Sequence, residues 1–168
     1  MISGRSAKAA YWVSKKGTRG IPAVSKEWKV ITGTVGMDAH VIGTKILSRV
    51  LRESGFNVIE LGCLTPPDDF IKVAQETAAD AILMSSLYGM AEFDLEGFKQ
   101  KLLEAGLGNI VLYIGGNLAS SRRDFDNFEN LEMKFRALGF DRVYPPNIDL
   151  SQVIIDLKND LIQRRKIA

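Results

Sequence analysis

The chain has 168 residues, of which 46% are hydrophobic and 25% are charged, and its formal net charge is +2. This length suits one domain with a sizeable core, and the small net charge lacks the basic excess typical of nucleic-acid-binding proteins. No apolar run approaches the ~20 residues that span a bilayer, so we expect a soluble, cytoplasmic protein that binds neither nucleic acid nor membranes.

Residues 1–28 come first and are interpreted as a basic, mobile N-terminal arm. The first 26 residues contain Lys and Arg but no acidic side chain, and Gly17, Gly20 and Pro22 interrupt any helical pattern. The composition is weakly similar to that of an organelle transit peptide, but a disordered extension is the favoured interpretation.

Residues 29–168 alternate apolar runs with amphipathic stretches and are expected to form one domain. The predicted strands span 30–35, 58–61, 81–85, 110–114 and 142–144, and the predicted helices span 41–54, 68–78, 95–105, 125–138 and 150–163. Strands that alternate with helices and are joined by short loops predict an α/β fold with a doubly wound, five-stranded parallel sheet.

The loop after the first predicted strand contains the only histidine of the chain, His40, two residues after Asp38. Loops at the carboxyl edge of such a sheet are where ligands bind. Two further loops at this edge are unusual in composition. One carries Ser85, Ser86, Leu87, Tyr88 and Gly89 after the third strand, and the other carries Gly115, Gly116 and Asn117 after the fourth. Together they predict one crevice with hydroxyl groups and a glycine-lined slot.

A single histidine excludes sites that need several imidazoles, and a single cysteine, Cys63, excludes an internal disulfide and multi-cysteine zinc sites. We expect Cys63 to be a small buried apolar residue. One imidazole suits an axial metal ligand whose second ring nitrogen donates to a carboxylate, a role for which Asp38 is placed. The metal would then arrive in a macrocycle, either haem or corrin.

These loops carry a resemblance to a known family. The pattern Asp38-x-His40-x-x-Gly43, then Ser85-x-Leu87, then Gly115-Gly116 resembles the signature of cobalamin-binding domains. Further runs, at residues 55–58, 68–71, 85–89, 115–117 and 139–146, resemble the small, cobalamin-binding sigma subunits of glutamate mutase, also called methylaspartate mutase. The similarity covers about residues 29–161.

The resemblance implies a flavodoxin-like domain that binds adenosylcobalamin with its nucleotide base displaced from cobalt. His40 would then be the axial ligand to cobalt, with Asp38 behind it, and Ser85 would bind the inserted base. The slot wall would be Gly115 and Gly116, and Gly43 would let the following helix start beside the tail. The remaining positions implied to contact the cofactor are Ala39, Val41, Ile42, Lys45, Ser86, Leu87, Tyr88, Gly89 and Asn117.

The family's reaction is the radical-based interconversion of L-glutamate and 3-methylaspartate, an isomerase activity that the resemblance assigns to a complex. Substrate binding would belong to a separate (β/α)₈-barrel catalytic subunit, because such a barrel needs about 250 residues. The resemblance implies a heterotetramer of two small and two large subunits, with the small subunit inactive alone. Candidate contacts to corrin or partner are Leu64, Tyr88, Met90 and Phe93.

Two alternatives share the signature. A corrinoid methyl carrier of a methyltransferase system uses the same motif, but it carries a helical domain for which residues 1–28 are too few. A non-catalytic cobalamin sensor or storage module, with the basic arm docking on another macromolecule, is also compatible with the residues. A mutase acting on another acid fits as well.

Overall fold

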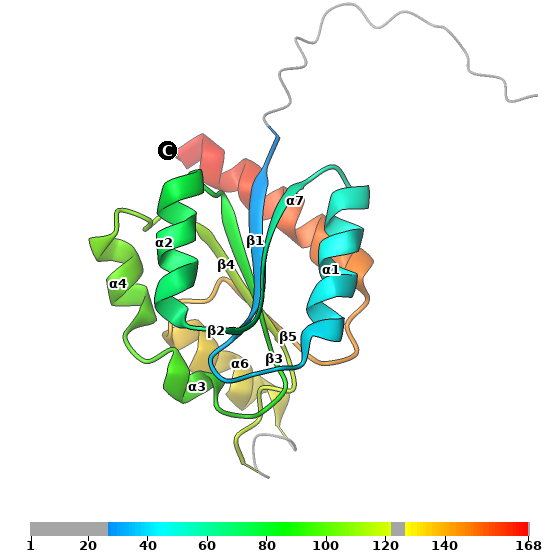
Figure 1. Ribbon diagram of the computed structural model, residues 1–168, viewed down its shortest axis with the longest axis vertical. Helices are drawn as coiled ribbons and strands as arrows, with labels where there is room; N and C mark the ends of the chain where they lie inside the picture. The colour runs from blue at the N-terminus through cyan, green and yellow to red at the C-terminus, as the bar shows by residue number, and fades with distance from the viewer. Residues whose placement is uncertain (1–26, 122–126, 168) are drawn as a thin grey trace, which may run out of the picture.

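The computed structural model describes residues 27–121 and 127–167. These residues form one sheet of five parallel strands in the order β2-β1-β3-β4-β5 (Figure 1). The strands are β1 (Lys29–Val35), β2 (Asn57–Thr65), β3 (Ala81–Ser86), β4 (Val111–Gly116) and β5 (Arg142–Tyr144). This strand order is that of flavodoxin-like proteins. The predicted fold class is therefore confirmed.

Helices cover both faces of the sheet (Figure 1). They are α1 (Val41–Glu53), α2 (Pro67–Thr77), α3 (Ala91–Asp94), α4 (Phe98–Glu104), α6 (Phe128–Ala137) and α7 (Leu150–Ile167). On one face, α1 and α7 pack through Leu51, Val153 and Leu157. On the other, α2, α4 and α6 pack through Phe70, Phe98 and Phe135. None of the described helices is long and apolar enough to cross a membrane.

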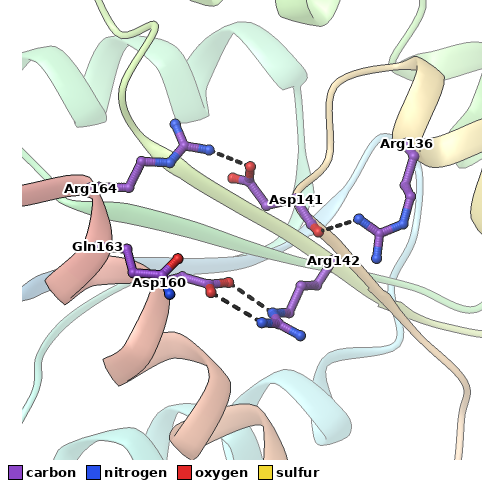
Figure 2. A pocket seen from close by; sticks show the side chains of 6 residues that line it. All are labelled: Arg136, Asp141, Arg142, Asp160, Gln163 and Arg164. Atoms are coloured by element: carbon purple, nitrogen blue, oxygen red, sulfur yellow. Dashed lines mark hydrogen bonds and ion pairs between the residues drawn. The ribbon is translucent and has the colours of Figure 1, made fainter. Parts of the chain in front are cut away.

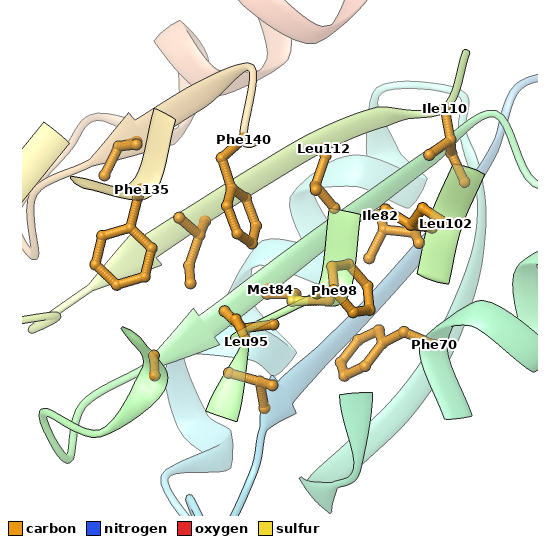
Figure 3. Packing of buried hydrophobic residues seen from close by; sticks show 14 of the residues in the cluster. Phe70, Ile82, Met84, Leu95, Phe98, Leu102, Ile110, Leu112, Phe135 and Phe140 are labelled. Atoms are coloured by element: carbon orange, nitrogen blue, oxygen red, sulfur yellow. The ribbon is translucent and has the colours of Figure 1, made fainter. Parts of the chain in front are cut away.

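The larger core lies under α2, α4 and α6 and is rich in phenylalanine. Figure 3 shows Phe70, Phe98, Phe135 and Phe140 against strand residues that include Met84. Phe70 and Phe135 are fully buried, and burying one such side chain stabilises the fold by about 1.5–3 kcal/mol. The near-continuous apolar strands follow from this arrangement, since a parallel strand is covered on both faces.

Several boundaries differ from the sequence-based prediction. The predicted helix 95–105 begins only at Phe98, as α4, because Gly97 takes a left-handed conformation with φ of 75° just before it, and the short helix α3 was not predicted. The predicted strand 58–61 extends to Thr65. The predicted helix 125–138 corresponds to α6, which spans Phe128–Ala137. Residues 122–126 are outside the part of the chain that the structure describes.

The predicted arm, residues 1–28, lies outside the described residues except for Glu27 and Trp28. Trp28 packs against the smaller core under α1 and α7. Cys63 was expected to be buried, and this was wrong. It is exposed, since β2 is an edge strand and its pairing with β1 shifts register around Gly62.

Candidate functional site

The candidate site lies at the carboxyl ends of β1, β3 and β4. The chain leaves β1 for one side of the sheet and β3 for the other, which makes this edge the topological switch point where ligands bind in open α/β sheets. In the strand register, Thr34 is paired with Ser85, Ser85 with Gly115, and Gly115 with Tyr144. The three loops singled out from the sequence therefore meet.

Asp38 is the centre of the loop between β1 and α1. Its side chain is fully buried, and Oδ1 accepts hydrogen bonds from the backbone N–H of His40, at 2.8 Å, and from His40 Nδ1, at 2.7 Å. Its other oxygen, Oδ2, accepts from the backbone N–H of Leu87 at 2.6 Å. One carboxylate thus orients the imidazole and joins the loop after β1 to the loop after β3.

The imidazole of His40 faces outward. The residue is the N-cap of α1, and its side chain is 61% exposed. An ionised carboxylate only accepts hydrogen bonds, so Nδ1 carries the proton and Nε2 carries the lone pair. Within residues 27–121 and 127–167, Nε2 has no hydrogen-bond partner. The arrangement presents one electron-pair donor to a metal, with its tautomer fixed by Asp38.

The main chain of Asp38 is held as firmly as its side chain. Its carbonyl oxygen accepts from Thr34 Oγ1 at 2.9 Å and from the Leu64 N–H at 2.9 Å. Leu64 makes this contact from a left-handed conformation, with φ of 56°, which is uncommon for a side chain of this size. Sequence reasoning missed both supports. Thr34 lies within the predicted strand 30–35 with no sign of this contact, and the backbone of Leu64 leaves no signal in the sequence.

A slot of about 310 Å³ opens beside this loop, on the face of the sheet that α1 and α7 cover. It is lined by Ser85 and Gly115 at the ends of β3 and β4, by Gly43 of α1 and by Tyr144 of β5. Its other lining residues are Ile46, Leu47, Leu83, Met84, Leu87, Tyr113, Ile114, Gly116, Pro145, Pro146, Ile148, Leu150 and Val153. The slot is therefore largely apolar, with few polar groups to orient a ligand.

The glycines of the slot differ in what a side chain would meet. A Cβ at Gly43 would touch nothing within 4 Å, so glycine there keeps open space at the slot. A Cβ at Gly115 would lie 3.3 Å from Tyr144 Cβ. A Cβ at Gly116 would overlap the carbonyl oxygen of Ser86, so glycine there is required by strand packing.

The structure brings only part of the predicted set together. Gly43, Ser85, Leu87, Gly115 and Gly116 line the slot. Ser86 points to the other face and is fully buried, and its hydroxyl has no hydrogen-bond partner among the described residues.

Lys45 is exposed and makes no hydrogen bond or ion pair with Asp38 or His40. Tyr88 is turned toward the loop after β1, where its hydroxyl accepts from the Met37 N–H at 3.2 Å. The remaining predicted positions, Ala39, Val41, Ile42, Gly89 and Asn117, do not line the slot.

Figure 2 shows a second cavity, of about 300 Å³, at the opposite edge of the sheet, where β5 begins. Its arginines are paired within the protein. Arg142 donates to both carboxylate oxygens of Asp160, at 2.8 and 3.1 Å, and Arg164 pairs with Asp141. The guanidinium of Arg142 lowers the pKa of Asp160 below its usual value. These charges satisfy one another, so this cavity is not the candidate site.

The paired charges nevertheless help to shape the slot. Asp160 also accepts from the Tyr113 hydroxyl at 2.6 Å, and Tyr144 donates to Asp156 at 2.9 Å. Burial is the main cause that raises the pKa of both tyrosines above the usual value, so both donate as neutral phenols. Two residues that line the slot are in this way fixed to α7.

This fold and this site define a cobalamin-binding domain. The profile of a family described as B12 binding domain matches residues 28–130. A solved cobalamin-binding protein from Desulfitobacterium hafniense DCB-2 is similar in fold, with a TM-score of 0.63 and 20% identity, over 80% of this chain and 59% of that one.

Two relatives are much closer in sequence. The glutamate mutase sigma subunit of Fusobacterium nucleatum subsp. nucleatum is 47% identical over 132 residues, which are 79% of this chain and 95% of that protein. The glutamate mutase sigma subunit of Carboxydothermus hydrogenoformans is 46% identical over 136 residues, which are 81% of this chain and 97% of that protein. The chain belongs to the family of glutamate mutase sigma subunits.

Proposed function

We propose that this chain is the cofactor-binding subunit of an adenosylcobalamin-dependent glutamate mutase and that His40 is its axial ligand to cobalt. The observation that carries the proposal is the pairing of His40 Nδ1 with the buried carboxylate of Asp38 at 2.7 Å, which leaves Nε2 facing outward. A basic, oriented imidazole of this kind is what a protein supplies to a metal.

The donors at the site suit a macrocyclic cofactor. No group of three or more His, Cys, Asp or Glu side chains among the described residues could hold a metal ion, so a metal at His40 has to bring its other ligands. The slot of about 310 Å³ suits the planar base of the nucleotide tail, because it is mostly apolar. Ser85 Oγ has no partner within the described residues and is free to hydrogen-bond that base.

When bound, the cofactor would supply the radical, through homolysis of its cobalt–carbon bond, for the rearrangement that interconverts glutamate and 3-methylaspartate. The residues of this chain bind and orient. His40 would bind cobalt through Nε2 in place of the cofactor's own base, and Asp38 would hold the proton on Nδ1. The slot buries the displaced base, and Gly43 keeps space for the tail between α1 and the sheet.

A large catalytic subunit with a (β/α)₈ barrel is part of the proposal, in a heterotetramer of two small and two large subunits. Exposed apolar side chains at the end of β2 and on the loops and helices that follow β1 and β3 support a covering partner. Met37 is 76% exposed, Ile42 75% and Phe93 62%, and Leu64 and Met90 are about half exposed. Exposed apolar groups gathered in this way mark an interaction surface. Cytoplasmic location is also proposed, and the free, exposed Cys63 suits a reducing compartment.

The test has two arms. In the first, purified chain is titrated with adenosylcobalamin, and the visible spectrum is compared with that of His40→Ala. We expect saturable binding and a spectrum that differs between the two proteins, and an identical spectrum would contradict the role of His40. In the second, conversion of L-glutamate is measured for the chain alone and with the barrel subunit of a glutamate mutase. Turnover is expected only with both, and turnover by the chain alone would refute the division of labour.

A further inference from the structure

Tyr88 makes a contact that neither the proposed axial role nor the slot explains. Its hydroxyl accepts from the backbone N–H of Met37 at 3.2 Å and donates to the carboxylate of Asp94, the last residue of α3. The tyrosine therefore joins the loop that carries His40 to the short helix that follows β3. Both partners lie within the described residues, and neither belongs to the slot.

Gly36 shows how closely this contact is packed. Its φ is 71°, and a Cβ built there would overlap both the Asp94 carboxylate and the Tyr88 hydroxyl. The backbone N–H of Gly36 donates to Thr65 O at 2.8 Å. The glycine thus lets the backbone approach the pair of side chains while the loop remains attached to the end of β2.

The loop after β1 is fastened to the loop after β3 at two successive residues. The Leu87 N–H holds the Asp38 carboxylate, and the Tyr88 hydroxyl holds the Met37 N–H. Asp38 in turn orients the ring of His40. We infer that Tyr88 and Asp94 are positioning residues for His40, which hold the backbone before Asp38 so that the imidazole stays at its place beside the slot. This inference rests on the proposed function of His40.

The direction of the hydrogen bonds supports this role. The hydroxyl of Tyr88 has one hydrogen, which it donates in a hydrogen bond to Asp94. Its oxygen lone pairs are therefore left to accept from the Met37 N–H. Phenylalanine at position 88 would leave the Met37 N–H to water, because Met37 is exposed. The loop after β1 would then lose the hydrogen bond from Met37 to Tyr88 and keep the one between Asp38 and Leu87. The buried core under α2, α4 and α6 would stay intact.

Three variants and one control separate positioning from general stability. Tyr88→Phe removes the hydroxyl that joins Met37 to Asp94, and Asp94→Ala removes the carboxylate that accepts from this hydroxyl. Asp94→Asn keeps a carbonyl acceptor for the tyrosine. Asp68→Asn is the matched control, because Asp68 is an exposed helical carboxylate whose ion pair is with Lys101, on another helix. The first measurement is the hydrogen-exchange rate of the Met37 amide by NMR, in protein without cofactor. The second is the affinity for adenosylcobalamin.

Removing one hydrogen bond is expected to accelerate exchange at Met37 and to weaken cofactor binding, each by about two- to tenfold, in Tyr88→Phe and Asp94→Ala. Asp94→Asn should lie nearer to the wild-type protein, and Asp68→Asn should match it. A Tyr88→Phe protein with wild-type exchange and wild-type affinity would overturn the inference. If the wild-type chain binds no adenosylcobalamin, the proposed function fails, while the exchange rates still decide whether Tyr88 holds the loop.

Discussion

Replacing Asp38 with asparagine tests the centre of the site, because it changes one oxygen to an amide NH₂ and leaves the shape. The carboxylate accepts three hydrogen bonds, two from His40 and one from Leu87. An asparagine has one acceptor oxygen, so it cannot serve both sides. If its oxygen faces His40, its NH₂ group faces the Leu87 N–H, and two donors meet.

The size of the effect follows from these contacts. Losing a hydrogen bond to a charged group costs about 1.5–3 kcal/mol, and the lower cost of burying a neutral amide offsets part of it. We expect the free energy of unfolding to fall by about 1–3 kcal/mol. Losing the carboxylate behind a metal-binding histidine should weaken cobalamin binding about 10–100-fold, which corresponds to about 1.4–2.8 kcal/mol.

Urea unfolding of the cofactor-free protein measures the first quantity, and titration with adenosylcobalamin followed in the visible spectrum measures the second. Asp68→Asn is again the control, because the side chain is 68% exposed and its ion pair with Lys101 is worth at most about 1 kcal/mol. If Asp38→Asn matches the wild-type protein in both stability and affinity, Asp38 is only a turn residue.

Three further predictions concern the slot and its supports. Gly43→Leu should weaken binding of cobalamin but not of cobinamide, which lacks the nucleotide tail, because the new side chain would occupy the open space at Gly43 without disturbing the helix. Gly116→Ala should lower the free energy of unfolding by about 1–3 kcal/mol in urea, because its Cβ would overlap the carbonyl of Ser86. The pairing of Asp160 with Arg142 should stabilise the fold at pH values above the usual pKa of an aspartate. This stabilisation should be lost as the pH falls through the lowered pKa that Asp160 has in the folded state. Urea unfolding as a function of pH should therefore show a weaker acid dependence for Asp160→Asn.

Each of these predictions has an outcome that contradicts it. Equal loss of cobalamin and cobinamide affinity in Gly43→Leu would mean that the slot does not take the tail. A fully stable Gly116→Ala would show that the strand can shift at little cost. An acid unfolding profile of Asp160→Asn that is parallel to that of the wild-type protein would remove Asp160 from the charges that hold α7 to β5.

The fold was largely predictable because its signals are local. Apolar strands buried on both faces stand out as continuous runs, such as residues 81–84, and their alternation with helices predicts a parallel sheet. Errors arose where tertiary structure overrides a local pattern. Gly97 delays the start of a helix that the apolar spacing alone would begin at residue 95, and Cys63 is exposed because β2 is at the edge of the sheet.

The site was predictable only in part. Asp38 and His40 are visible in the sequence because their contact is local, two residues apart. The contacts of Leu64 and Tyr88 with the same loop are not visible in the sequence, since they join residues that are distant in the chain and each of them involves a backbone N–H. Tyr88 was interpreted as a contact to corrin or partner, and the structure places its hydroxyl on the Met37 N–H.

The most direct test of the axial role uses the fact that His40 is the only histidine of the chain. Protein labelled with ¹⁵N-histidine therefore carries the label at one imidazole. Its complex with cobalamin, reduced to the Co(II) form, is compared with the unlabelled complex by electron paramagnetic resonance. The account predicts superhyperfine splitting from one nitrogen that changes from the three-line pattern of ¹⁴N to the two-line pattern of ¹⁵N. A splitting that the label leaves unchanged would mean that the cofactor's own base occupies the lower position, and it would contradict the central claim.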